Sequence, residues 1–254
     1  TYAGNLDNLL PVHDNPRYSF ERADIADREA VERIVDQYAI DTIVNFAAET
    51  HVDRSILEPD AFISTDVVGT YVLLDMLRLS GVERMLHVST DEVYGDVQEG
   101  YSVETDPFEP NSPYAASKAS ADLLVRSYCR THQFPGIVTR CSNNYGPNQF
   151  PEKLIPVVIL KAAAGESIPL YGDGGNVRDW LYVEDHCRAI WRVLEAGTPG
   201  EVYNVGGNSE KTNLEVVDAL CAANGLNKRS VIQPGQRLEL PTGASAPITW
   251  PNSS

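Results

Sequence analysis

Short apolar runs rich in β-branched residues alternate with longer amphipathic segments along this chain, and that alternation constrains the fold more than any other feature. The runs lie at Thr42–Phe46, Arg84–Ser89, Gly136–Arg140 and Val202–Val205, and a further short strand is predicted at Tyr18–Arg22. The intervening segments carry apolar residues at helical spacing. Strands that alternate with helices favour right-handed βαβ crossovers and a mostly parallel sheet. The predicted fold class is α/β, with a Rossmann-like doubly wound parallel sheet and a smaller C-terminal substrate-binding domain.

The amphipathic segments are predicted to be helices. Their expected ranges are Asp27–Tyr38, Ala61–Ser80, Tyr114–His132, Lys153–Ala164, Val183–Ala196 and Thr212–Ala223. Thr212 and Glu215 have the spacing of a capping box, in which each side chain satisfies a backbone N–H of the other residue.

The acidic charge of the chain excludes several classes of partner. The sequence has 36 acidic and 20 basic residues, which gives a formal net charge of −16. A field of this sign repels nucleic acid phosphates and anionic membrane surfaces, so we expect neither as a partner. No apolar run approaches the ~18 residues of a membrane span, and no signal peptide is recognised. An anionic small molecule would have to be met by individually placed Arg and Lys side chains.

The cysteines indicate a reduced compartment. Cys129, Cys141, Cys187 and Cys221 are widely separated and form no C-x-x-C pair. We therefore predict four buried free thiols, no metal site and a cytoplasmic location. His51 has no obvious companion ligands in the sequence and is predicted to form hydrogen bonds in a loop.

A candidate active site stands where the Arg84–Ser89 strand ends. Thr90 follows that strand, and ligands of open α/β sheets bind outside the carboxyl ends of the strands. Tyr114 and Lys118 open the next helix at positions i and i+4, which face the same side. A lysine ammonium beside a phenol favours the phenolate, so we predict a lowered pKa for Tyr114 and a role as base toward an alcohol. A surface tyrosine with a solvated lysine is the alternative.

Asp91 and Glu92 follow Thr90 and form an adjacent acid pair. Paired carboxyl groups can have their pKa values split, so that one donates a proton while the other accepts one. Elimination of water needs that division of roles. A solvated pair of loop acids remains the alternative.

Six segments carry a family resemblance. They are TYAGN at 1–5, AAETHVDRSI at 47–56, STDEVYG at 89–95, PYAASK at 113–118, RCSNNYGP at 140–147 and GDGGNVRDW at 172–180. In this order they resemble the dTDP-glucose 4,6-dehydratases, which are NAD-dependent members of the extended short-chain dehydrogenase/reductase family. The resemblance runs from residue 1 to about residue 225.

The resemblance implies a redox-neutral dehydration of a nucleoside-diphosphate glucose. It suggests dTDP-glucose, and uridine as the base stays open. A hydride passes from C4 to bound NAD while Tyr114 accepts the hydroxyl proton, supported by Lys118 and Thr90. Glu92 then removes the C5 proton as Asp91 protonates the departing C6 hydroxyl, and the hydride returns to C6. Oxidation at C4 turns a poor carbon acid into a usable one, and the product is a 4-keto-6-deoxy sugar nucleotide.

The resemblance also implies the residues that bind the cofactor and the substrate. The residues expected to contact NAD are Thr1, Asp24, Ile25, Phe46, Ala47, Ala48, Thr65, Tyr114, Lys118 and Asn144. Those expected to contact the sugar nucleotide are Thr50, Thr90, Asn143, Lys153, Leu154, Pro169, Tyr171, Arg178 and Asn213.

Several of these residues have a plainer interpretation that stays open. Arg178 suits a diphosphate, because a guanidinium grips two oxygens at once, but it also suits a surface ion pair with a neighbouring aspartate. Asn143 and Asn144 suit the turn that follows them. Asp24 suits the cap of the next helix.

Two features depart from the family pattern. The sequence contains no G-x-x-G-x-x-G phosphate loop, and Gln233-Pro-Gly-Gln-Arg-Leu stands where the family carries an Arg-Pro-Gly-His-Asp pattern. We therefore expect a fragment that lacks the N-terminal Gly-rich unit and the C-terminal end. Within it, residues 1–145 and about 175–205 are predicted to form the NAD-binding domain, and residues 146–174 and 206–254 the substrate-binding part.

Two other functions remain open. A sugar-nucleotide 4-epimerase or decarboxylase of the same fold needs no acid pair after the strand, because an epimerase only moves a hydride. A GDP-mannose-type dehydratase differs at the first position of that pair. A binding or scaffold protein that has lost turnover is the alternative from another class. The broad apolar faces of the Ala61–Ser80 and Tyr114–His132 helices predict a homodimer.

Overall fold

The computed structural model describes residues 3–164, 166–168, 170 and 172–223. Its contacts divide the chain into two units. The main unit holds residues 9–142 and 188–205, and the small unit holds the described residues among 3–8, 143–187 and 206–223. The predicted site residues Thr1, Pro169 and Tyr171, and the altered segment that begins at Gln233, lie outside the described residues.

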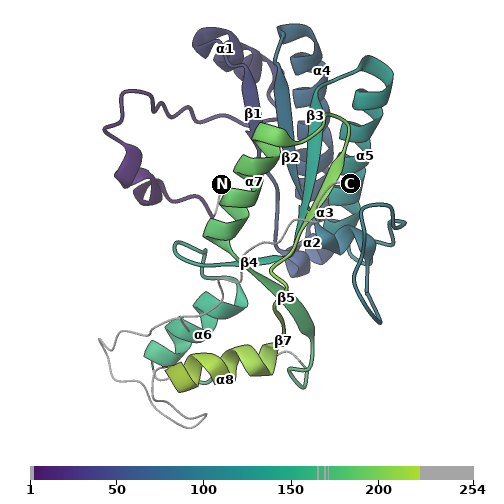
Figure 1. The fold of residues 1–254 in the computed structure, drawn as a ribbon. Helices are drawn as coiled ribbons and strands as arrows, with labels where there is room; N and C mark the ends of the chain where they lie inside the picture. The colour runs from purple at the N-terminus through teal and green to yellow at the C-terminus, as the bar shows by residue number, and fades with distance from the viewer. Residues whose placement is uncertain (1–2, 165, 169, 171, 224–254) are drawn as a thin grey trace. The chain divides into compact units, whose positions relative to one another are not determined.

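A four-stranded parallel sheet forms the centre of the main unit (Figure 1). Its order is β1 (Thr42–Asn45), β2 (Arg84–Thr90), β3 (Gly136–Cys141) and β6 (Val202–Val205). All three neighbouring pairs run parallel. Parallel neighbours need crossover connections, and helices supply them here. The prediction of an α/β fold with a parallel sheet is therefore confirmed.

Helices cover both faces of this sheet. On one face lie α1 (Arg28–Tyr38), α4 (Thr70–Ser80) and α5 (Pro113–His132), whose apolar side chains share one core with Met85 of β2. On the other face, α7 (Val183–Ala196) packs Ile190 and Val193 against Leu86. Successive residues of a strand point to opposite faces, so Met85 and Leu86 enter different cores.

The helix ends follow local sequence signals. The Asp27 carboxylate accepts a hydrogen bond from the Ala30 amide and caps α1. Asp24 is therefore not the cap; its carboxylate accepts from the Ala26 amide in the preceding turn. Gly81 takes a left-handed conformation, with φ of 77°, at the end of α4. Glycine adopts that conformation without a Cβ penalty, which makes it a common helix stop.

The predicted strand at Tyr18–Arg22 is wrong. The segment forms no ladder, because no strand in the described part of the chain pairs with it. A strand needs a neighbour for its backbone groups. Its Glu21 carboxylate instead accepts hydrogen bonds from Tyr38 at 2.9 Å and Arg33 at 3.3 Å, which ties the segment to α1.

The helix predicted at Ala61–Ser80 is interrupted. After α2 (Val52–Leu57), α3 (Pro59–Phe62) leads into η2 (Ile63–Gly69), which is a π-helix, and α4 then continues to Ser80. The wider turn accompanies a buried carboxyl group, Asp66, and a close approach at Gly69, where a Cβ would meet Ile25. π-helical turns within helices often occur at functional sites.

The small unit has its own sheet and core. Strand β5 (Val177–Tyr182) pairs parallel with β4 (Asn143–Tyr145) and antiparallel with β7 (Glu210–Thr212). Helices α6 (Leu154–Ala163) and α8 (Asn213–Ala223) pack around Trp180. The capping box is confirmed: the Glu215 amide donates to the Thr212 hydroxyl at 3.1 Å, and the Thr212 amide donates to the Glu215 carboxylate at 2.7 Å.

A boundary between the two units lies inside α7. By contacts, residues 175–187 group with the small unit, because β5 pairs there with β4 and β7. The chain returns to the main unit at Arg188, inside α7. The segment Leu6–Val12 forms a short 3-10 helix, η1.

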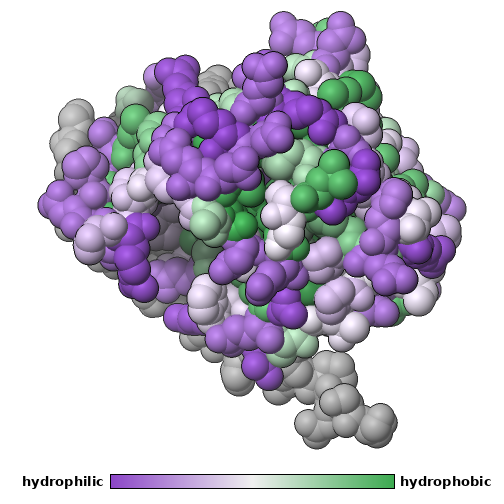
Figure 2. All heavy atoms as spheres, turned by 90° about the horizontal axis from the view of Figure 1, so that it is seen from above, coloured by the Kyte–Doolittle hydropathy of each residue, from purple (hydrophilic) through white to green (hydrophobic). Residues whose placement is uncertain are grey.

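Among the described residues all four cysteines are free thiols, as predicted, but only Cys221 is fully buried and Cys187 is exposed. In the described part of the chain, no helix combines the length and the apolar character needed to cross a membrane. Figure 2 shows one face on which hydrophilic residues predominate and hydrophobic residues gather around a hollow near the middle.

Candidate active site

The carboxyl end of β2 leads directly into a single turn of 3-10 helix, η3 (Asp91–Tyr94). Thr90 caps this turn: its hydroxyl accepts from the Glu92 amide at 3.3 Å and donates to the Asp91 carboxylate at 3.3 Å. The side chains of Asp91 and Glu92 are half-buried. One capping residue therefore holds the turn that carries both members of the acid pair.

Tyr114 and Lys118 lie in the first two turns of α5, which begins after a Ser112 cap. Both residues are buried and share one face of the helix. The Lys118 Nζ donates to the carbonyl oxygen of Val88 in β2 at 2.8 Å. The Tyr114 ring packs edge-on against Phe62, with 6.3 Å between centroids. This places the phenol and the ammonium beside β2, as predicted.

The pKa of Tyr114 is raised above its ordinary value, and the prediction that it is lowered is wrong for this structure. Burial is the largest cause, and the negative charge of Glu92 raises the pKa further, while a hydrogen bond with Thr90 lowers it. The Lys118 ammonium, which donates to the Val88 carbonyl, is not among the causes of this shift. Tyr114 therefore holds its proton at neutral pH in this state.

Asp66 lies next to this site, and our sequence interpretation missed it. Its carboxylate accepts from the Ser117 hydroxyl at 2.7 Å and from the Glu49 amide at 3.0 Å, and the residue is 1% exposed. Burial raises the pKa of Asp66, and the nearby Lys118 ammonium lowers it. In turn, burial lowers the pKa of Lys118 and Asp66 raises it. The sequence signal was the spacing of Asp66, four residues after Phe62, which places this carboxyl group on the same helix face as an apolar residue.

A second buried polar pair lies within the sheet. The Asn45 amide of β1 and Nδ1 of His87 of β2 are 3.2 Å apart, and both residues are buried. Burial, and then the charge of Lys118, hold the pKa of His87 well below its ordinary value. The neutral imidazole therefore leaves Lys118 as the cation of this cluster. Polar residues inside the predicted strands were the signal that could have found the pair.

The residues expected to meet NAD in the main unit lie on loops at strand ends and on η2. Phe46 follows the carboxyl end of β1 and is 58% exposed, which is unusual for a large apolar side chain there. Ala47 and Ala48 are half-buried, and the Ala47 amide donates to the Asn45 side chain at 3.1 Å. Thr65 is half-buried in η2, and Thr50 is exposed.

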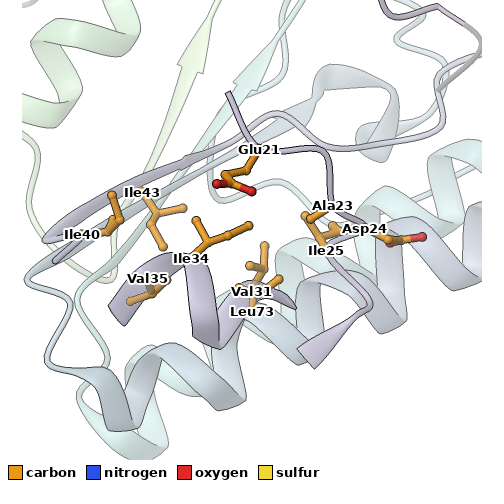
Figure 3. A pocket seen from close by; sticks show the side chains of 10 residues that line it. All are labelled: Glu21, Ala23, Asp24, Ile25, Val31, Ile34, Val35, Ile40, Ile43 and Leu73. Atoms are coloured by element: carbon orange, nitrogen blue, oxygen red, sulfur yellow. The ribbon is translucent and has the colours of Figure 1, made fainter. Parts of the chain in front are cut away.

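Asp24 and Ile25 help to line a hollow of about 280 Å³ in the main unit. Figure 3 shows the aliphatic side chains from α1, β1 and Leu73 of α4 turned toward one another, whereas the Asp24 carboxylate points away from them. None of the lining residues belongs to β2, η3 or α5. This hollow is therefore separate from the acid pair and Tyr114.

The other predicted substrate residues that the structure describes belong to the small unit, and so does Asn144, which was expected to contact NAD. Asn143 and Asn144 lie in β4, opposite Trp180 and Leu181 of β5. Arg178 is exposed in β5. The neighbouring Asp179 carboxylate accepts from the amides of Gly207 at 2.6 Å and Ser209 at 2.7 Å, so it is turned toward that loop.

The last three substrate candidates stand at helix starts in the small unit. Lys153 occupies the N-cap position of α6, 3.7 Å from the Glu152 carboxylate, and Leu154 is the first residue of the helix. Asn213 begins α8 and is buried, with its side-chain oxygen lacking a hydrogen-bond partner within the described residues. A buried orphan acceptor of this kind suits a ligand hydroxyl or amide.

A family model and curated relatives match most of this chain. The family model described as GDP-mannose 4,6 dehydratase matches residues 1–240. The chain is 52% identical over 233 residues to dTDP-glucose 4,6-dehydratase from Neisseria gonorrhoeae, covering 87% of this chain and 67% of that protein. It is 55% identical over 232 residues to the enzyme of that name from Xanthomonas campestris pv. campestris (strain B100), covering 87% of this chain and 66% of the relative. The chain thus spans about two thirds of the length of these curated relatives.

Among solved structures, the dTDP-glucose 4,6-dehydratase DesIV from Streptomyces venezuelae, with NAD and TYD bound, superposes with a TM-score of 0.88. It is 49% identical, and the match covers 92% of this chain and 72% of that one.

Proposed function

The chain belongs to the GDP-mannose 4,6 dehydratase family, and from that premise we propose that it dehydrates dTDP-glucose with NAD as cofactor. The reaction converts the sugar nucleotide to its 4-keto-6-deoxy form with release of water. It is a hydro-lyase reaction, since the oxidation at C4 and the reduction at C6 cancel.

One observation carries this proposal: the turn that carries the acid pair lies beside the Tyr114 phenol. Thr90 caps the turn that holds Asp91 and Glu92, and Thr90 and Glu92 both lie near enough to the buried Tyr114 to change its pKa. Elimination of water needs an acid and a base next to the group that handles the C4 hydroxyl. A chain that only moved a hydride would not need the two carboxyl groups there.

NAD, when bound, supplies the acceptor and the later donor of the hydride. Tyr114 accepts the proton of the C4 hydroxyl in its phenolate form, so the protonated phenol seen here must first lose its proton, and Lys118 is the buried cation proposed to favour that loss. Glu92 removes the proton at C5, whose acidity the C4 carbonyl has raised, and Asp91 protonates the C6 hydroxyl as it leaves. A nearby negative charge on Glu92 raises the pKa of Tyr114, so proton uptake by Glu92 in turn eases loss of the Tyr114 proton.

The described residues fit one part of NAD. Buried Lys118 and Tyr114 at the carboxyl end of β2 suit the nicotinamide riboside, and exposed Phe46 offers a flat apolar surface beside them along the same sheet edge. Diphosphates are usually bound by backbone N–H groups of a glycine-rich turn before a helix. The 254 residues contain no such G-x-x-G-x-x-G turn, so we assign no residue of this chain to the diphosphate of NAD.

For the sugar nucleotide, we propose Thr50 and Thr90 as binding residues of the main unit. In the small unit we separately propose Asn143, Lys153, Leu154, Arg178 and Asn213. Arg178 is the proposed diphosphate partner, because its side chain is exposed and Asp179 is turned to a backbone loop. We also propose the predicted division, in which residues 1–145 and about 175–205 bind NAD and residues 146–174 and 206–254 form the substrate-binding part.

The test measures turnover and cofactor binding separately. The chain is incubated with NAD and dTDP-glucose, loss of water is followed by mass spectrometry, and NAD binding is measured by calorimetry. We expect dehydration with dTDP-glucose and little with GDP-mannose or UDP-glucose. An epimerised product of unchanged mass would favour the 4-epimerase, and bound NAD or sugar nucleotide without any turnover would favour a binding protein.

We also propose a homodimer and a cytoplasmic location. Val68, Tyr71 and Leu79 along η2 and α4 and Leu123 of α5 are 44% to 72% exposed although neighbouring residues of the same helices are buried in the core. A second apolar face on adjacent helices suits helix packing against another copy. The free thiols of the described cysteines support a reducing compartment.

A further inference from the structure

Arg140 of β3 is fully buried and forms an ion pair with a carboxylate of α5, the helix that carries Tyr114 and Lys118. Its Nε and Nη2 donate to the two oxygens of Asp122 at 2.8 and 3.1 Å, and both side chains have 0% exposure. Asp122 lies four residues after Lys118 on α5, so the two share one face of that helix. The fork thus fixes α5 to β3 one turn beyond the proposed site.

The remaining side of the same guanidinium holds the turn with the acid pair. Nη1 donates to the Tyr94 hydroxyl at 2.5 Å and to the Glu104 carbonyl at 3.2 Å, and the Tyr94 hydroxyl donates to Asn204 of β6 at 2.8 Å. The guanidinium carbon also lies 4.6 Å from the ring centroid of Phe108. Tyr94 is the last residue of η3, two positions after Glu92.

Stability alone is a weak reason for such a pair. Removing two charges from water is costly, and buried ion pairs can often be replaced by apolar residues of similar volume without loss of stability. An apolar residue cannot reproduce the planar set of N–H donors of a guanidinium, which forms hydrogen bonds to two elements at once. Here those elements are η3, which carries Asp91 and Glu92, and α5, which carries Tyr114 and Lys118.

We propose that Arg140 is a positioning residue that fixes the acid pair on η3 relative to the Tyr114–Lys118 pair on α5. It acts through Tyr94 and Asp122 and contacts none of the four reacting side chains in any described hydrogen bond. The inference rests on the proposed dehydration, because that reaction needs both pairs to meet one sugar. A displacement of about 1 Å at such a site can cost about 100-fold in rate.

The main test replaces both buried charges together, as Arg140→Met with Asp122→Leu. We expect kcat to fall about 10- to 100-fold with KM for dTDP-glucose nearly unchanged, since geometry and not binding is disturbed. Amide hydrogen exchange in residues 91–95 should quicken by about 10-fold or more, because η3 loses its anchor, while the thermal unfolding midpoint stays near that of the wild type.

The matched control removes another interhelical ion pair, as Arg28→Met with Asp75→Leu. Arg28 of α1 and Asp75 of α4 are 2.7 Å apart and lie on helices other than η3 and α5. The double variant should therefore leave both kcat and amide exchange in residues 91–95 unchanged. Tyr94→Phe deletes only the hydroxyl that Arg140 holds, and it should give the same pattern to a smaller degree even where the double variant fails to fold.

Two results would overturn the proposal. One is wild-type kcat in a folded Arg140→Met/Asp122→Leu protein and in Tyr94→Phe; the other is unchanged exchange in residues 91–95. A fall in kcat that the Arg28/Asp75 control shares would also count against it, as a general loss of stability. If the wild-type chain shows no turnover, the proposed function fails by itself, and the exchange experiment still decides whether Arg140 anchors η3.

Discussion

Burial of the Tyr114 ring and the negative charge of Glu92 raise the pKa of Tyr114, and Thr90 acts in the opposite direction. A tyrosine that is protonated at neutral pH can act as a base only if its surroundings lower the pKa of its phenol. The Thr90 hydroxyl is therefore the residue-scale feature that most directly tunes the proposed chemistry.

We expect Thr90→Val to lower kcat at neutral pH by about 10-fold and to move the rising limb of the pH–rate profile to higher pH. The sign follows from the hydrogen bond, which lowers the pKa of Tyr114 and is lost in the variant. The profile of kcat against pH is the measurement. Thr139→Val is the matched control, because the buried Thr139 hydroxyl on the adjacent strand β3 has no hydrogen-bond partner among the described residues.

His186 predicts how stability depends on pH. Burial lowers the pKa of His186 from 6.5 to about 4. Between these values the unfolded chain binds a proton that the folded chain does not, so the free energy of unfolding falls as the pH drops from about 7 to about 4. The shift corresponds to about 3 kcal/mol.

We therefore expect His186→Leu to remove about 3 kcal/mol of acid destabilisation across that range. Denaturant unfolding at several pH values measures it. His13→Leu, which removes an exposed imidazole with 71% side-chain exposure, is the control. Equal pH dependence in the wild type and His186→Leu would show that the imidazole is solvated or paired in the folded protein.

At the scale of elements, the turn η3 depends on a close approach between two backbone segments. Gly95 ends the turn with φ of 79° and ψ of −156°, a conformation open essentially to glycine alone. A Cβ there would collide with the backbone carbonyl of Glu109, whose amide donates to Val93 at 3.1 Å. The loop that precedes α5 thus supports the turn that carries the acid pair.

Gly95→Ala should destabilise the protein by about 2 kcal/mol or more and lower kcat further than the lost stability explains, because η3 must shift. Thermal unfolding and kcat measured on the same preparation separate the two effects. Gly100→Ala has a matching positive φ of 81° but open space around the added Cβ. It should cost only about 1 kcal/mol and leave kcat unchanged.

The helices also show where sequence patterns succeed at this scale. The α1, α5 and α8 helices were predicted within a residue or two, because apolar spacing and capping residues act locally. The Tyr18–Arg22 strand and the unbroken Ala61–Ser80 helix were wrong. A strand needs a partner elsewhere in the chain, and the π-turn of η2 surrounds a carboxylate held by Ser117, 51 residues away.

For the molecule as a whole, the proposed dimer makes a testable surface. Leu123 of α5 is 51% exposed in the single chain. The charge introduced by Leu123→Glu should therefore lower the free energy of unfolding of the monomer only slightly. Burial of that charge between two copies would be costly. We expect analytical ultracentrifugation to show a dimer for the wild type and a monomer for Leu123→Glu. Leu160→Glu, at an equally exposed site on α6 of the small unit, should remain dimeric.

The sequence by itself determined the α/β class, the strand order's parallel sense, the position of the acid pair after β2, and the Tyr114–Lys118 spacing. These follow from periodicity and from the rule that places ligands at the carboxyl ends of strands. Only the tertiary structure decided the protonation of Tyr114, the burial of Asp66 beside Lys118, and the clamp of Arg140 on Asp122 and Tyr94. Burial and side-chain hydrogen bonds depend on which segments, distant in the sequence, come into contact. Local sequence patterns do not predict those contacts.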